Sequence, residues 1–183
     1  HIGYKEGYRG ISWKRFNPSA SPVVEIVSMH GASESDNAMP SYLHTMGPRS
    51  GMNTMQGGLS KGLMFGVVGN TDHHSSSPGS YGSGRTGVWS IGKDRESIWS
   101  ALVDKHTMAF TGDRIETALF LDGKPFGSVV KAGDEVMADL YIAARSSLDR
   151  VELIQDGNVI FCEDSFPSIQ SGIKLFDFSL GWG

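Results

Sequence analysis

The sequence is poor in three features that would narrow its function: cysteine, long apolar runs and positive charge. Cys162 is the single cysteine among 183 residues, so an intramolecular disulfide is excluded. No apolar run is long enough to span a bilayer as a helix, and we expect no membrane span. The formal net charge is −4, so we expect no nucleic-acid partner.

The N-terminus gives no information on compartment. No signal peptide is visible, and the chain begins with His1 rather than Met. The sequence therefore leaves the localisation unknown.

The charged and titratable residues are unevenly distributed along the chain. All six histidines lie at or before His106, and residues 111–183 hold 6 Lys+Arg against 12 Asp+Glu. The length suits one large domain or two small ones, and this asymmetry indicates two regions with different roles. We place the boundary between 1–113 and 114–183.

The first region has an α/β pattern. Apolar runs predict strands at 23–28, 65–68 and 107–111. Helices are predicted at 53–61 and, after an Asp94 N-cap, at 95–105, with Ile98, Ala101, Leu102 and Lys105 on one face. The first helix would be the crossover that lets strand 65–68 run parallel to strand 23–28.

The second region has the pattern of an antiparallel β protein. Asp122-Gly123 and Asp156-Gly157 are hairpin signals, and residues 136–143 alternate between apolar and polar. This pattern indicates a sandwich, or a sheet that packs against the first region. Further strands are predicted at 115–121, 149–154, 159–161 and 173–180.

The most informative stretch for function follows strand 65–68. Asp72 and His74 are two residues apart, so on an extended backbone they would point the same way. A carboxylate and an imidazole that converge suit a divalent transition metal such as Zn, Mn or Fe. Alternatively, Asp72 caps a turn and the histidines are ordinary polar loop residues. The spacing does not decide between the two.

Strand 23–28 ends in a similar group of residues. Glu25 interrupts its apolar run, and a buried carboxylate needs a partner or a metal. His30 and Glu34 follow in the next turn. Two neighbouring strands would therefore each deliver imidazole and carboxylate groups at their C-terminal ends.

These segments together resemble an uncharacterised family of the PHP (polymerase and histidinol phosphatase) superfamily of metal-dependent phosphoesterases. The similarity runs along nearly the whole chain. The segments that carry it are His1-Ile2-Gly3-Tyr4, Val24-Glu25-Ile26-Val27-Ser28-Met29-His30-Gly31-Ala32-Ser33-Glu34, Gly69-Asn70-Thr71-Asp72-His73-His74, Ile98-Trp99-Ser100-Ala101-Leu102 and Phe110-Thr111-Gly112-Asp113-Arg114-Ile115.

The resemblance implies a partial PHP-type distorted β/α barrel, followed by an antiparallel β-sandwich-like region. It maps the superfamily's final Asp-x-His metal motif onto Asp72 and His74, and an earlier metal histidine at or beside His1. Glu25, His30 and Glu34 would complete this site or orient its ligands.

One departure from the superfamily pattern is large. Its opening His-x-His segment and a bridging carboxylate have no counterpart before His1. We therefore expect the chain to be the C-terminal part of a longer protein with only a partial metal site. An alternative is a catalytically inactive fragment or interaction module that oligomerises through its β-rich region, and we expect a homo-oligomer.

The resemblance also implies a reaction class, a metal-dependent hydrolase that acts on a small anionic or phosphorylated substrate. His73 would contact the substrate or shuttle a proton. Arg85 would meet an anionic group, or is an exposed loop arginine with no such role.

Overall fold

The computed structural model describes residues 2–37, 45–76, 79–80, 83–131, 133, 135–164 and, for the backbone alone, 172–181. The chain divides into two compact units, His1–Gly112 (unit 1) and Asp113–Gly183 (unit 2). No helix in the described ranges has the length and apolar character to cross a membrane.

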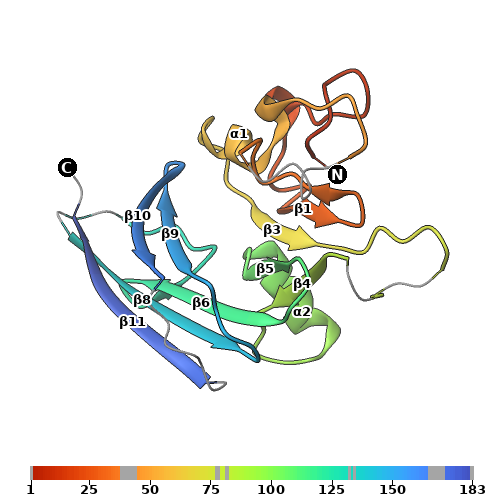
Figure 1. Ribbon diagram of the computed structural model, residues 1–183. Coiled ribbons are helices and arrows are strands. Elements are labelled where there is room, and N and C mark those ends of the chain that lie inside the picture. The colour runs from red at the N-terminus through yellow and green to blue at the C-terminus, as the bar shows by residue number, and fades with distance from the viewer. Residues whose placement is uncertain are drawn as a thin grey trace. The chain divides into compact units, whose positions relative to one another are not determined.

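Unit 1 is built around a pair of parallel strands, which Figure 1 shows side by side. Its sheets have the strand orders β2-β1-β3 and β4-β5, and only the β1–β3 pair is parallel among the described strands. The elements are η1 (Trp13–Arg15), β1 (Val23–Ser28), β2 (Gly31–Ala32), η3 (Gly51–Asn53), α1 (Met55–Leu59), β3 (Gly66–Gly69), β4 (Arg85–Val88), α2 (Arg95–Val103) and β5 (Thr107–Phe110).

The expectation of a β/α barrel is wrong. The described strands form small, mostly antiparallel sheets that do not close on themselves. A barrel needs a helical crossover for each parallel strand, whereas α1 has five residues and includes Gly57 and Gly58, which disfavour a longer helix. The parallel pairing of β1 with β3, which the crossover argument predicted, is nevertheless present.

An aromatic core holds the N-terminal segment of unit 1 against β1. The Trp13 ring stacks on Phe65 at a centroid distance of 5.3 Å, and Phe16 meets Trp13 edge-on at 5.3 Å. Ile2 and Val24 complete the buried cluster. Burial of these large side chains fixes the irregular first segment and gives η1 a defined position.

Helix α2 is shorter and less buried than its sequence pattern predicts. It ends at Val103, and Ala101 is its one buried residue. Ile98 and Trp99 are exposed, so the expected apolar face does not pack as a whole within the described structure. Asp94 caps the helix as predicted, since its carboxylate accepts hydrogen bonds from the Ser97 N–H at 2.9 Å and the Ser97 hydroxyl at 2.6 Å.

The described strands of unit 2 pair in antiparallel fashion. The four-stranded sheet has the order β11-β8-β6-β7, and β9 pairs with β10. The elements are β6 (Ile115–Leu121), β7 (Lys124–Pro125), β8 (Glu135–Ala144), β9 (Val151–Gln155), β10 (Asn158–Glu163) and β11 (Gly172–Gly181). Strand β11 lies at an edge of its sheet, and the expected homo-oligomer stays a prediction.

The predicted alternation along β8 sets the core of unit 2. Its inward residues Leu140 and Ile142 pack with Val151 of β9, and Ile115 of β6 joins them. The hairpin predicted at Asp122-Gly123 is confirmed, because Leu121 pairs with Lys124 and both turn residues have positive φ, at 48° and 71°. This geometry is that of a type I′ turn, which matches the twist of the flanking strands.

We predict that the cap of α2 makes unit 1 sensitive to acid. The hydrogen bond from the Ser97 hydroxyl, aided by the Ser97 N–H, lowers the pKa of Asp94 below its ordinary value. A lowered pKa in the folded state means that the stabilisation is complete above the ordinary aspartate pKa and is lost as the pH falls through the folded value.

NMR titration of the Asp94 carboxyl carbon measures this shift directly. In Ser97→Ala the pKa should move upward toward the ordinary value, while the backbone N–H still donates. Asp94→Asn should keep the cap and lose the acid dependence. An unshifted Asp94 in the native chain would contradict the assignment.

Candidate metal centre

The candidate site is built where the parallel strands β1 and β3 end. Beyond the last strand pair, the Asn70 N–H donates to the carbonyl of Val27 at 3.0 Å, and the Met29 N–H donates to the carbonyl of Thr71 at 3.2 Å. These backbone bonds hold the two outgoing segments beside each other. They therefore place His30, which follows β1, next to the loop that follows β3.

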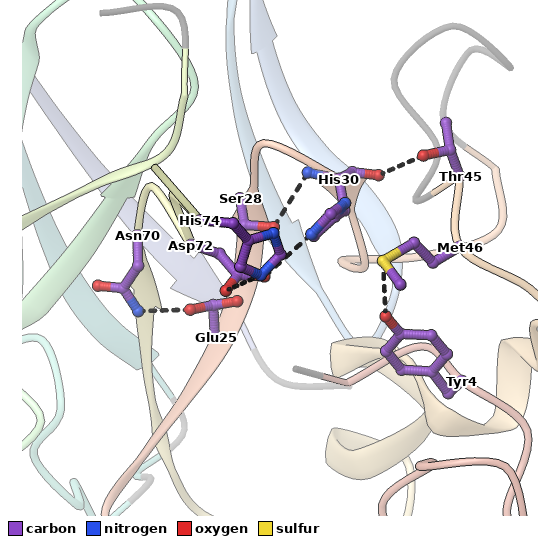
Figure 2. Close-up of polar contacts among 9 residues, drawn as sticks. All are labelled: Tyr4, Glu25, Ser28, His30, Thr45, Met46, Asn70, Asp72 and His74. Carbon is purple, nitrogen blue, oxygen red and sulfur yellow. Dashed lines mark hydrogen bonds and ion pairs between the residues drawn. The ribbon is translucent and has the colours of Figure 1, made fainter. Parts of the chain in front are cut away.

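Three side chains converge at this point. The Nε2 atom of His30 lies 3.2 Å from Asp72 Oδ2, and the Nε2 atom of His74 lies 3.5 Å from Asp72 Oδ1. Figure 2 shows both imidazoles directed at the one carboxylate. The centroids of the two imidazole rings are 5.4 Å apart. Asp72 is the centre of the group, and each histidine lies beside a different oxygen of its carboxylate.

The backbone at Asp72 differs from the extended geometry that the spacing argument assumed. β3 ends at Gly69, and Asp72 has φ of 47°, in the left-handed region. Aspartate and asparagine tolerate this conformation better than other non-glycine residues. Asp72 and His74 thus converge because the chain turns, and the prediction that they converge on an extended strand is wrong in its geometry.

The three side chains differ in exposure. His30 is 15% exposed, Asp72 27% and His74 67%. The group is anchored in the protein at His30 and open to solvent on the side of His74. A site with one open side leaves room for a further ligand to approach.

The donor atoms lie close enough together to be candidates for the ligands of one metal ion. One ligand atom from each residue can be chosen so that all three lie within 4.8 Å of one another. The separations of 3.2 and 3.5 Å end on different oxygens of Asp72, so each describes one imidazole against one carboxylate oxygen. Two imidazoles and a carboxylate are donor types that Zn, Mn and Fe accept.

A second group of polar contacts supports the same loop. Asn70 donates from Nδ2 to Glu25 Oε2 at 2.6 Å, and Thr86 Oγ1 lies 2.7 Å from the Gly69 carbonyl and 3.3 Å from Asn70 Oδ1. Figure 2 shows Asn70 with Glu25. The amide thus links the Glu25 carboxylate of β1 to the start of the loop that carries Asp72.

The two ends of this loop are held close together at Gly84. A Cβ atom at position 84 would lie 2.6 Å from the Val27 carbonyl oxygen and 2.7 Å from that of Asn70. A side chain at position 84 would collide with these two carbonyl groups, so the return of the chain into β4 requires glycine there. The loop base is therefore fixed by backbone contact as well as by the Thr86 and Asn70 side chains.

The other residues expected at the site have different positions. His73 accepts a hydrogen bond at Nδ1 from the Ser75 N–H at 3.1 Å and is not part of the three-residue group. Arg85 is the first residue of β4 and half-buried, so it is not an exposed loop arginine. Glu34 is exposed and, among the described residues, does not join the group. His1 lies outside the described residues.

The sequence predicted that His30 completes the site or orients its ligands. It did not predict that Asn70 and Thr86 support the loop that carries Asp72. His30 offers its Nε2 directly to the group, as Asp72 and His74 do. The signal for His30 was its place at the end of a strand parallel to β3. Nothing in the local sequence marks Thr86, because its role depends on where β4 returns beside β3.

Comparison with known proteins does not assign an activity to this site. Residues 79–146 match the model of a family described as a protein of unknown function (DUF3604). The matched segment includes β4, α2 and β5 to β8, and it contains none of His30, Asp72 and His74.

Two curated relatives are similar over most of the chain, and both are described as uncharacterised proteins. One, from Chlamydia pneumoniae, is 29% identical over 167 residues, which are 82% of this chain and 27% of that protein. The other, from Chlamydia muridarum, is 26% identical over 168 residues, with the same two shares. The chain thus spans about a quarter of the length of these relatives, and no solved structure matches it.

We predict that the protein binds one Zn²⁺ through this group. Asp72→Asn tolerates the left-handed backbone and removes the charge, so it should reduce Zn²⁺ affinity without unfolding the chain. His30→Ala and His74→Ala should do the same. Removal of a side chain that binds the metal directly should weaken Zn²⁺ binding more than removal of an outer-sphere partner. We therefore expect the Zn²⁺ affinity to fall at least about 100-fold. Titration against a chromogenic chelator measures these affinities.

The matched control is His73→Ala, which removes a neighbouring imidazole from the same loop but outside the group. Its Zn²⁺ affinity should stay within about threefold of the native value, well below the effect of an outer-sphere partner. Equal losses in His73→Ala and His74→Ala would show that the loop histidines bind metal without regard to this geometry.

Proposed function

We propose that His30, Asp72 and His74 hold a catalytic divalent transition metal, and that the protein containing this chain is a metal-dependent hydrolase acting on phosphate esters. The observation that carries the proposal is the convergence of two Nε2 atoms on one carboxylate at the ends of parallel strands. The reaction class comes from the resemblance to the PHP superfamily. Since the barrel that the same resemblance implied is absent from the described residues, the support for this reaction class within the chain is the site and not the fold.

The chemistry of the donor set suits hydrolysis. A metal held by three protein ligands with one side open lowers the pKa of a bound water and stabilises negative charge on phosphoryl oxygens. The chain's own contribution is to hold the ligands in place. His30 is largely buried beside β1, and the backbone bonds of Met29 and Asn70 fix the two segments relative to each other.

The open side lies at His74, so the substrate would approach there. His73 follows Asp72 directly and is half-buried, with its Nδ1 accepting from the Ser75 N–H. Its Nε2 would remain available to donate a hydrogen bond to a leaving group or to pass a proton. Its role in this proposal is contact with the substrate rather than with the metal.

We predict that the protein loaded with Zn, Mn or Fe hydrolyses 4-nitrophenyl phosphate or its bis-ester. Turnover should fall at least about 100-fold in Asp72→Asn and in His74→Ala, because the metal is lost. It should fall at least about 100-fold in His73→Ala, with the metal retained, as expected for loss of a proton donor. Release of 4-nitrophenol measures the rate.

Metal content must be measured on the same samples. Protein with full metal occupancy at this site and no turnover above background, for both the monoester and the diester, would contradict the proposed activity. Turnover that persists in Asp72→Asn with its metal removed would instead show that the reaction occurs elsewhere.

A further inference from the structure

Unit 1 has a second feature that the metal centre does not use, a cleft of about 460 Å³ beside β1. Its walls come from the N-terminal segment and from the first half of β1, and they include Ile11, Arg15, Phe16, Val23 and Glu25. This volume lies within the usual range of small-molecule sites. The cleft lies within unit 1 alone.

One wall of the cleft is apolar and held in place by the aromatic core. The Phe16 ring meets Trp13 edge-on at 5.3 Å and Phe65 at 5.7 Å, with interplanar angles of 69° and 78°. Trp13 is buried and fixed by its stack on Phe65. A preformed aromatic wall of this kind binds the flat apolar part of a ligand at little entropic cost.

The one positively charged residue among the described residues of the lining is Arg15. Arg15 is the last residue of η1 and exposed, and it takes part in none of the side-chain hydrogen bonds or ion pairs of the described structure. Its guanidinium can therefore receive a phosphate or carboxylate with two parallel hydrogen bonds. Glu25 is the negatively charged residue of the lining, and its carboxylate already accepts a hydrogen bond from the Asn70 amide.

Glu25 also connects the cleft to the metal centre. It lines the cleft, and its bond to Asn70 reaches the loop two residues before Asp72. Glu25 is thus a structural link between the cleft and the loop that carries Asp72.

We propose that this cleft binds a small organic anion with a flat apolar body, whose phosphate or carboxylate group pairs with Arg15. We further infer, on the basis of the proposed function, that it holds the non-reacting part of the substrate. The substrate class would then be a phosphate ester that carries an apolar group and a second negative charge.

The test is an NMR titration of the full ¹⁵N-labelled chain with phenyl phosphate in EDTA, so that no metal contributes. The amides of Phe16 and Val23 should shift in a saturable way. Arg15→Gln should weaken binding by at least about tenfold, through loss of charge-assisted hydrogen bonds. Lys14→Gln removes the same charge from the same short helix without altering the lining, and affinity should stay within about twofold.

Three further ligands test the chemistry. Benzoate should bind to the same amides with the same dependence on Arg15, which would establish a general organic anion site. Phenol lacks the charge and inorganic phosphate lacks the apolar body, so each should bind at least about tenfold more weakly than phenyl phosphate. Phenol binding as tightly as phenyl phosphate, or equal losses in the Arg15 and Lys14 variants, would overturn the proposal.

The measurements distinguish a failure of the cleft proposal from a failure of the hydrolase proposal. If the hydrolase proposal is wrong, binding at the cleft in EDTA is unaffected. If the cleft proposal is wrong, phenyl phosphate shifts no cleft amide in EDTA, and in the Zn²⁺-loaded protein its shifts are confined to residues 69–75. With active enzyme, Arg15→Gln should raise KM for a substrate with a second charge at least about fivefold, with kcat within about twofold.

Discussion

The parallel pairing of β1 with β3 is the interaction on which the candidate site depends. Without it, His30 and Asp72 would be separate loop residues, because they are 42 positions apart in the chain (72 − 30). The pairing runs from Val23 opposite Gly66 to Val27 opposite Gly69, and backbone bonds continue it past the strand ends. The carboxyl ends of adjacent parallel strands lie at one edge, which is where many α/β proteins place their chemistry.

The turn at Asp72 is the second constraint. Asp72 has a positive φ, a backbone conformation that aspartate adopts more readily than most other non-glycine residues. Here the Asn70 amide and the close backbone approach at Gly84 hold the base of the loop. The carboxylate is therefore presented to both imidazoles before any ligand arrives, which lowers the cost of binding one.

The sequence predicted the elements that depend on local pattern and not the architecture that depends on distant contacts. The alternation along β8 and the Asp122-Gly123 turn are local signals, and the structure confirms both. The barrel came from a family resemblance, and it failed because the described chain lacks the helices that repeated parallel crossovers require. The residues of the site were found from strand ends, whereas their geometry depended on the turn at Asp72 and on the position of β4.

The most direct test of this account is the position of a bound metal. Crystals of the full chain soaked in Zn²⁺ or Mn²⁺ and measured at the metal's absorption edge give an anomalous difference map. The account predicts a peak about 2.0–2.2 Å from Nε2 of His30, Nε2 of His74 and one oxygen of Asp72. A strong peak elsewhere on unit 1, or an empty site while the metal is bound at other positions, would contradict it.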